Sequence, residues 1–166
     1  MARKFDAALL IGGGSKNPKQ HEIDVKAGLE DIVAKLDLGD RVKFTGYIPD
    51  DDLATYYRKA EVFVLPSKYE PFGMTTLEAM SCGTPVIATR FGGIKDDLKH
   101  NVDSLLVDPT DPQEFSKAML KVLTDEKLAS KLSKNGRKTI AQTFSWESIA
   151  ARTIKFYEQF STAGAG

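Results

Sequence analysis

Five short, mostly apolar runs separated by helical patterns constrain the fold of this chain more than any other feature of its sequence. The runs lie at residues 7–11, 42–48, 62–65, 85–89 and 104–107. Short continuous apolar runs are typical of strands that are buried on both faces of a parallel sheet. Between the first three runs, apolar side chains recur at helical spacing over residues 22–36 and 49–60. This alternation predicts an α/β fold with a layered, doubly wound parallel sheet.

The last third of the sequence is helical in pattern. Asp111 is placed to cap a helix, and residues 127–142 have the pattern of a basic one. Trp146 begins an apolar stripe along the final helix, so we expect its side chain in the core. The 166 residues are enough for one domain and too few for two ordinary ones. We therefore expect one domain over residues 1–160, with a helical C-terminal end and a flexible tail at 161–166.

Composition and charge exclude several classes of function. The 23 basic and 23 acidic residues balance, which argues against bulk binding of nucleic acid. No window approaches the roughly 18 uninterrupted apolar residues that a membrane span needs, and residues 1–4 lead straight into a strand instead of a signal peptide. The single Cys82 excludes an intrachain disulfide, and it has no second thiol or clustered histidine with which to bind a metal. We therefore expect a cytoplasmic protein without a membrane span or a metal site.

Two carboxylates bracket the segment that best fits a binding site. Glu70 lies in the loop after the run at 62–65, and Glu78 lies in the first turns of a helix that we expect to begin at Thr75. In doubly wound sheets such loops line the crevice at the carboxyl ends of the strands. Free N–H groups at a helix start attract a phosphate, whereas carboxylates accept hydrogen bonds from sugar hydroxyls. A ligand that has both phosphate and hydroxyl groups fits this pattern best.

The glycine loop at residues 12–14 follows the first apolar run and partly matches a dinucleotide fingerprint. That fingerprint has glycines at its first, third and sixth places, and here the sixth place is Asn17. The next helix begins several residues later, so the tight turn that holds a pyrophosphate is missing. The Asn17 position and the absence of an acidic residue that would bind the ribose disfavour a Rossmann oxidoreductase. Two interpretations of Gly13 stay open, namely a loop that a ligand approaches closely or a plain turn.

Residues 61–108 carry a set of motifs that belong together. They are EVFVLPS at 61–67, YEPFGMT at 69–75, GTPVIAT at 83–89, Gly92-Gly93 and Val107-Asp108-Pro109. These motifs resemble the donor-binding half of the family 4 retaining glycosyltransferases, which have the GT-B architecture of two Rossmann-like domains. Residues 69–75 and the Gly46-Tyr47 loop are most similar to the branch of the sucrose-phosphate and mannosylfructose-phosphate synthases. The similarity extends over nearly the whole chain.

The resemblance implies a role for each matching position. It assigns Glu78 to the ribose hydroxyls of a nucleotide sugar and Glu70, as the catalytic carboxylate, to a hydroxyl of the transferred hexose. It also assigns the backbone around Gly73, Met74 and Thr75 to the diphosphate and Tyr47 to the base. Phe72 and Gly13 complete the positions that we expect to bind the donor. The implied donor is a UDP-, GDP- or ADP-sugar, and no metal or other cofactor is needed. The implied reaction moves glucose or mannose to a sugar or sugar-phosphate acceptor.

The sequence also departs from the family pattern. Family 4 donor domains usually begin with a strand that ends in a Gly-Arg loop, followed by a helix with a lysine, and this Arg and Lys hold the diphosphate. The chain has neither feature, and we expect the acceptor domain to lie outside this chain. Arg90, at a later strand end, has two open interpretations: a contact to phosphate or acceptor, or a solvated surface position. We expect a fragment that is inactive alone, with an open sheet edge that favours association, including homo-oligomers. The alternative is a non-catalytic nucleotide-binding or assembly module.

Overall fold

The structure of the protein is a computed structural model that describes residues 6–161. It confirms an α/β fold in which every paired strand among the described residues is parallel. The chain divides into two compact units, Met1–Leu53 and Ala54–Gly166, and each is described below by itself. The single domain expected over residues 1–160 stays a prediction. Of the expected tail at 161–166, Ser161 ends the last helix, and the other five residues lie outside the described range.

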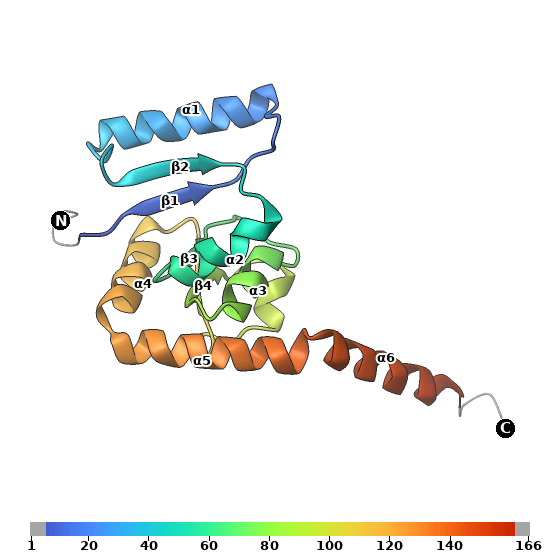
Figure 1. Ribbon diagram of the computed structural model, residues 1–166. Helices are drawn as coiled ribbons and strands as arrows, with labels where there is room; N and C mark the ends of the chain where they lie inside the picture. The colour runs from blue at the N-terminus through green and yellow to red at the C-terminus, as the bar shows by residue number, and fades with distance from the viewer. Residues whose placement is uncertain (1–5, 162–166) are drawn as a thin grey trace. The chain divides into compact units, whose positions relative to one another are not determined.

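The first unit is one parallel strand pair joined by a helix (Figure 1). Its elements are β1 (Leu9–Gly12), α1 (Gln20–Lys35) and β2 (Val42–Gly46), and Leu9 pairs with Val42 in the ladder. Glu22 closes the start of α1, because its carboxylate accepts the N–H groups of Ser15 and Lys19 at 2.7 and 2.8 Å. No side chain described within residues 6–53 is buried. One helix and two strands therefore give this unit little core of its own.

The second unit contains a three-stranded parallel sheet and most of the helices. The helix α2 (Asp50–Lys59) leads into it, and the boundary between the units falls within α2. The strands lie in the order β3-β4-β5. The elements after α2 are β3 (Phe63–Leu65), α3 (Met74–Ser81), β4 (Val86–Thr89), η2 (Gly93–Asp96), β5 (Leu105–Val107), α4 (Pro112–Thr124), α5 (Glu126–Thr143) and α6 (Trp146–Ser161).

The core lies in the second unit, around its central strand. All four residues of β4 are completely buried, as a continuous apolar run between two neighbouring strands predicts. The main core cluster joins β4 and β5 to the inner faces of α4 and α5, and its members are Ile87, Leu105, Val107, Phe115, Ala118, Val122 and Leu132. Asp111 caps α4 as predicted, since its side chain accepts the N–H groups of Gln113 and Glu114.

A buried carboxylate fixes the loop before β5 onto α5. Asp103 is only 2% exposed. Its two oxygens accept hydrogen bonds from the Lys99 N–H at 2.8 Å, the Ser104 hydroxyl at 3.2 Å and the Thr139 hydroxyl at 2.8 Å. Because each of these donors satisfies the carboxylate, the burial costs much less than that of an isolated charge.

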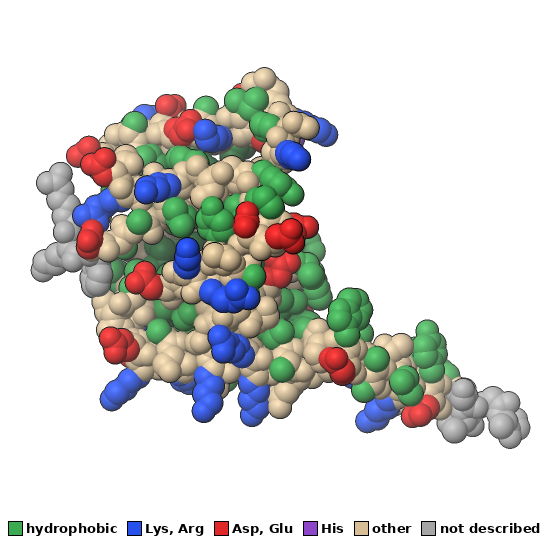
Figure 2. Space-filling model, in the orientation of Figure 1, with side chains coloured by type: hydrophobic (Ala, Val, Ile, Leu, Met, Phe, Trp, Pro, Cys, Tyr) green, Lys and Arg blue, Asp and Glu red, His purple; other side chains and the backbone are tan. Residues whose placement is uncertain are grey.

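The predicted core position of Trp146 is wrong. Its side chain is 83% exposed, and Phe156, Tyr157 and Phe160 further along α6 are each more than half exposed. Figure 1 shows α6 continuing beyond the end of α5, and Figure 2 shows hydrophobic side chains along it. The apolar stripe that the sequence predicts is present, but no other described element covers it. In contrast, Lys and Arg side chains project in a row along α5 (Figure 2), which matches the expected basic helix.

None of the helices in residues 6–161 is long and apolar enough to cross a membrane.

Candidate functional site

Two loops of the second unit are fastened together at Glu70. The loop after β3 and the loop after β4 form an isolated parallel bridge between Glu70 and Gly92. The Glu70 N–H donates to the Phe91 carbonyl at 3.2 Å, and the Gly93 N–H donates to the Glu70 carbonyl at 3.1 Å. Glu70 therefore has a fixed backbone, although it lies in a loop.

Gly92 makes this close approach possible. A Cβ atom on Gly92 would lie 1.9 Å from the Glu70 carbonyl oxygen, a distance that no side chain tolerates. The backbone at Gly92 has φ 109° and ψ −173°, a conformation that is essentially restricted to glycine. Gly92, the first of the two glycines that the sequence singles out, is thus required for the position of Glu70.

The side chain of Glu70 turns back to the start of α3. Its Oε1 atom accepts the Gly73 N–H at 2.9 Å, and no described residue donates to Oε2. Gly73 is the N-cap of α3 and has φ 76°, in the left-handed region that favours glycine. The half-buried Glu70 carboxylate thus stays near the helix start with one oxygen available to a ligand.

The first residues of α3 offer unused hydrogen-bond donors. Met74 and Thr75 are the first two helical residues, so their N–H groups have no partner within the helix, and both residues are exposed. Phe72, just before them, is also exposed, and its ring packs edge-on against Phe144 at 6.2 Å between centroids. Next in the helix, Thr76 is fully buried, and its Oγ1 atom has no hydrogen-bond partner among the described residues. The helix start can therefore accept an anion.

Glu78 lies one turn further along α3 and is half-buried. Its Oε2 atom accepts a hydrogen bond from the Tyr57 hydroxyl at 3.0 Å. Tyr57 comes from α2 and is 7% exposed. Burial and the hydrogen bond to Glu78 both raise the pKa of the Tyr57 hydroxyl above its usual value, so the hydroxyl remains a donor to a higher pH than that of a free tyrosine.

No pattern in the sequence indicates this role for Tyr57. Its helical spacing predicts only an apolar face on α2. The one available signal was its hydroxyl, because a buried tyrosine needs a partner for that group.

Gly13 and Tyr47 both belong to the first unit, so the structure relates them to each other but not to the two carboxylates. The Gly13 N–H donates to the Gly46 carbonyl at 3.1 Å, next to Tyr47. Gly13 has φ 146°, and a Cβ atom placed on it would meet nothing within 4 Å. Tyr47 is about half exposed. The open space at Gly13 permits the close approach of a ligand.

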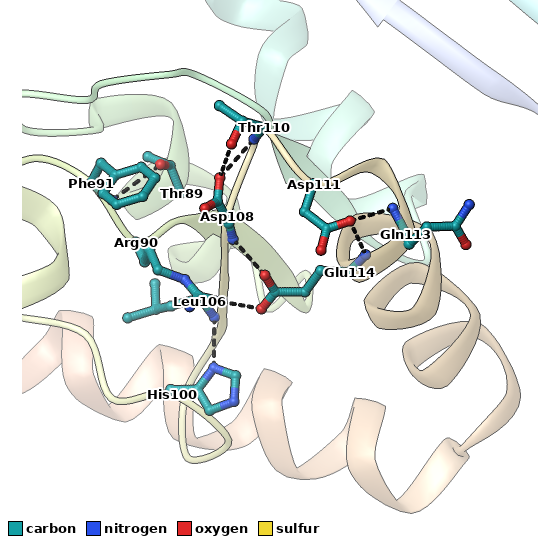
Figure 3. A network of polar contacts seen from close by, with 10 residues as sticks. All are labelled: Thr89, Arg90, Phe91, His100, Leu106, Asp108, Thr110, Asp111, Gln113 and Glu114. Carbon is teal, nitrogen blue, oxygen red and sulfur yellow. Dashed lines mark hydrogen bonds and ion pairs between the residues drawn. The ribbon is translucent and has the colours of Figure 1, made fainter.

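Arg90 forms an ion pair with a residue of α4 (Figure 3). It follows β4 and forms an ion pair with Glu114, whose other carboxylate oxygen accepts the Asp108 N–H at 3.0 Å. Asp108 in turn accepts hydrogen bonds from Thr110, which lower the pKa of its carboxyl group. In this structure Arg90 is part of a network that joins β4 and β5 to α4, so its cation is already paired.

Metal ligands do not gather in the described part of the chain. Within residues 6–161, no group of three His, Cys, Asp or Glu side chains is arranged to hold a metal ion. His100, one of the two histidines, accepts the Leu106 N–H at its Nδ1 atom, at 3.0 Å.

Comparison with known proteins identifies relatives that match more than nine-tenths of the chain. The family model of the glycosyl transferases group 1 matches residues 2–139. The mannosylfructose-phosphate synthase of Agrobacterium fabrum is 36% identical over 156 residues, which cover 94% of this chain and 34% of that protein. The sucrose-phosphate synthase structure from Thermosynechococcus elongatus is similar with a TM-score of 0.81 and 41% identity, over 93% of this chain and 39% of that one.

A nucleotide complex is also among the similar structures. The Anabaena protein HepE, solved in complex with UDP, has a TM-score of 0.82 and 25% identity, over 92% of this chain and 41% of that one. Across these three proteins, the chain spans only 34% to 41% of the relative's length.

Proposed function

Because the chain belongs to the glycosyl transferases group 1 family, we propose that it is the donor-binding portion of a retaining hexosyltransferase. The observation that carries this proposal is the arrangement around α3, where two half-buried carboxylates, Glu70 and Glu78, flank a helix start with free N–H groups. The proposed donor is a nucleotide diphosphate sugar, with UDP, GDP or ADP as the nucleotide. Glucose or mannose would pass to a sugar or sugar-phosphate acceptor.

In this proposal the two carboxylates accept hydrogen bonds from the hydroxyl groups of the donor. Glu78 binds the ribose, and Glu70 binds a hydroxyl of the hexose through its available Oε2 atom. Hydrogen bonds from hydroxyls to a carboxylate are charge-assisted, and each contributes about 1.5–3 kcal/mol. The distinct surroundings of the two carboxylates fit two distinct hydroxyl partners.

In this proposal the diphosphate binds at the N-terminus of α3. The N–H groups of Met74 and Thr75 are the unused donors of the first turn, whereas Gly73 is buried and forms the left-handed turn that begins the helix. Negative charge grows on the leaving diphosphate during glycosyl transfer, so fixed donors at this position lower the barrier. In this proposal those donors replace a metal ion. Phe72 borders the same turn.

The remaining contacts of the donor are proposed for the first unit. Tyr47 would flank the base, and the open backbone at Gly13 would allow close approach of the nucleotide. The UDP complex of HepE supports a nucleotide donor for a chain of this fold. Similarity to a sucrose-phosphate and a mannosylfructose-phosphate synthase supports a hexose donor and a sugar-phosphate acceptor.

The acceptor site belongs to a part that this chain does not supply. The chain covers little more than a third of its relatives, so we propose that a further domain binds the acceptor and that this chain alone does not transfer sugar. Association of copies through an open sheet edge and a cytoplasmic location complete the proposal.

Calorimetric titration of the 166-residue chain tests donor binding. The ligands are UDP, GDP and ADP and the glucose and mannose conjugates of each nucleotide. They are titrated into the wild type, Glu78→Gln and the exposed control Glu61→Gln. We expect one nucleotide series to bind, Glu78→Gln to weaken it roughly 10- to 100-fold through loss of a charged hydrogen-bond acceptor, and Glu61→Gln to leave it unchanged. Failure of every nucleotide to bind would refute the proposal. Binding of a nucleotide with no gain from the sugar would favour a non-catalytic module.

A further inference from the structure

We propose that Tyr57 is a positioning residue, which holds the Glu78 carboxylate in the orientation that receives the ribose. This inference rests on the proposed function, since it concerns the residue assigned there to the ribose. It is suggested by the hydrogen bond between the Tyr57 hydroxyl and Oε2 of Glu78, at 3.0 Å, which joins two helices.

Tyr57 is itself held by the surrounding structure. Its ring packs edge-on against Phe63 at the start of β3, with 5.5 Å between centroids and an interplanar angle of 84°. Its carbonyl oxygen accepts a hydrogen bond of 2.6 Å from the hydroxyl of Thr84, which is buried between α3 and β4. A donor fixed in this way can hold a flexible side chain, whereas an exposed and mobile hydroxyl cannot.

The hydrogen bond gives the two carboxylate oxygens of Glu78 different partners. Oε2 is occupied by Tyr57, and no described residue donates to Oε1, which is left for the ribose. A glutamate side chain that must be ordered on binding loses rotamer freedom at that step. If Tyr57 orders the side chain in the folded protein, this loss of conformational entropy no longer opposes binding, and the ribose contacts a carboxylate that is already oriented.

The substitution Tyr57→Phe isolates the hydroxyl. Phenylalanine retains the ring and its contact with Phe63, and the main-chain bond to Thr84 does not depend on the side chain. Tyr56→Phe, on the neighbouring residue of α2, is the matched control, because it removes the same group from a side chain that is 39% exposed. Circular dichroism and the thermal midpoint establish that both variants fold.

The test is a double-mutant cycle between this hydroxyl and the ribose. The full chain, as wild type, Tyr57→Phe and Tyr56→Phe, is titrated with the nucleoside diphosphate that the wild type binds and with its 2′,3′-dideoxy analogue. We expect Tyr57→Phe to weaken binding of the natural nucleotide roughly three- to tenfold, the net strength of one hydrogen bond. We expect almost no change for the dideoxy analogue, and none with Tyr56→Phe for either ligand.

The results distinguish failure of the positioning role of Tyr57 from failure of the assignment of Glu78 to the ribose. Equal weakening of both nucleotides by Tyr57→Phe would show a merely structural role and overturn the positioning role, with donor binding intact. Unchanged binding of the natural nucleotide by Tyr57→Phe would overturn it as well. If the wild type does not discriminate between the nucleotide and its dideoxy analogue, or binds neither, the assignment of Glu78 to the ribose fails and the role of Tyr57 fails with it.

Discussion

Replacement of Gly92 by alanine is expected to separate the two loops that hold Glu70. The Cβ atom of the new residue would lie 1.9 Å from the Glu70 carbonyl oxygen and 2.6 Å from the carbonyl carbon. Both are main-chain atoms, so no side-chain rotation relieves the overlap. Either the loops move apart or the second unit becomes strained.

The size of the effect follows from two contributions. Holding alanine at φ 109° and ψ −173° costs about 1–3 kcal/mol, because this conformation is nearly exclusive to glycine. Forcing a methyl group into a closely packed contact costs about another 1–3 kcal/mol. We therefore expect Gly92→Ala to lower the free energy of unfolding by about 2–6 kcal/mol.

Urea unfolding followed by far-UV circular dichroism measures this loss, and Gly28→Ala is the control. Gly28 lies within α1 and a Cβ atom there meets nothing within 4 Å, so alanine is expected to stabilise by up to about 1 kcal/mol. Hydrogen exchange of the Gly93 amide, which donates to Glu70, shows whether the loops separate without unfolding of the unit. A Gly92→Ala protein with wild-type stability and a protected Gly93 amide would refute this account of the close approach.

Two further predictions concern carboxylates outside the candidate site. Hydrogen bonds from the main chain of Lys19 and from Ser15 lower the pKa of Glu22 from 4.5 to about 2, so their stabilisation is complete above pH 4.5 and is lost as the pH falls toward 2. Carboxyl NMR titration checks this, and a Glu22 midpoint above pH 4 would contradict it. Asp103→Ala leaves three donors of a buried network without their acceptor, and we expect a loss of about 2–4 kcal/mol in urea unfolding. A loss within 0.5 kcal/mol, on the order of a surface substitution, would show that water replaces the carboxylate.

The sequence predicted the elements of this fold well, because its local signals and its tertiary structure agree. The run at 85–89 became the fully buried strand β4, and Asp111 caps α4 as expected. Family resemblance to the sucrose-phosphate and mannosylfructose-phosphate synthases was confirmed. Hydrophobic runs show which segments form strands, but they contain no information about which strands pair. The separate ladders β1-β2 and β3-β4-β5 could therefore not be read from them.

The candidate site was only partly predictable for a related reason. Glu70 and Glu78 occupy the loop and helix positions that their motif indicated. Tyr57 is 21 residues before Glu78, on another helix, and only the tertiary structure brings its hydroxyl there. Trp146 shows the opposite error, because helical periodicity identifies an apolar face without revealing whether anything in the same chain covers it. Roles in donor binding stay predictions.

The exposure of Trp146 has a practical consequence for spectroscopy of this protein. It is the only tryptophan in the chain and already lies in water in the folded state, so unfolding changes its surroundings little. Its fluorescence is therefore a poor signal for denaturation. It is a sensitive reporter of any event that removes water from the first turn of α6, and a blue shift of its emission would reveal such an event without a label.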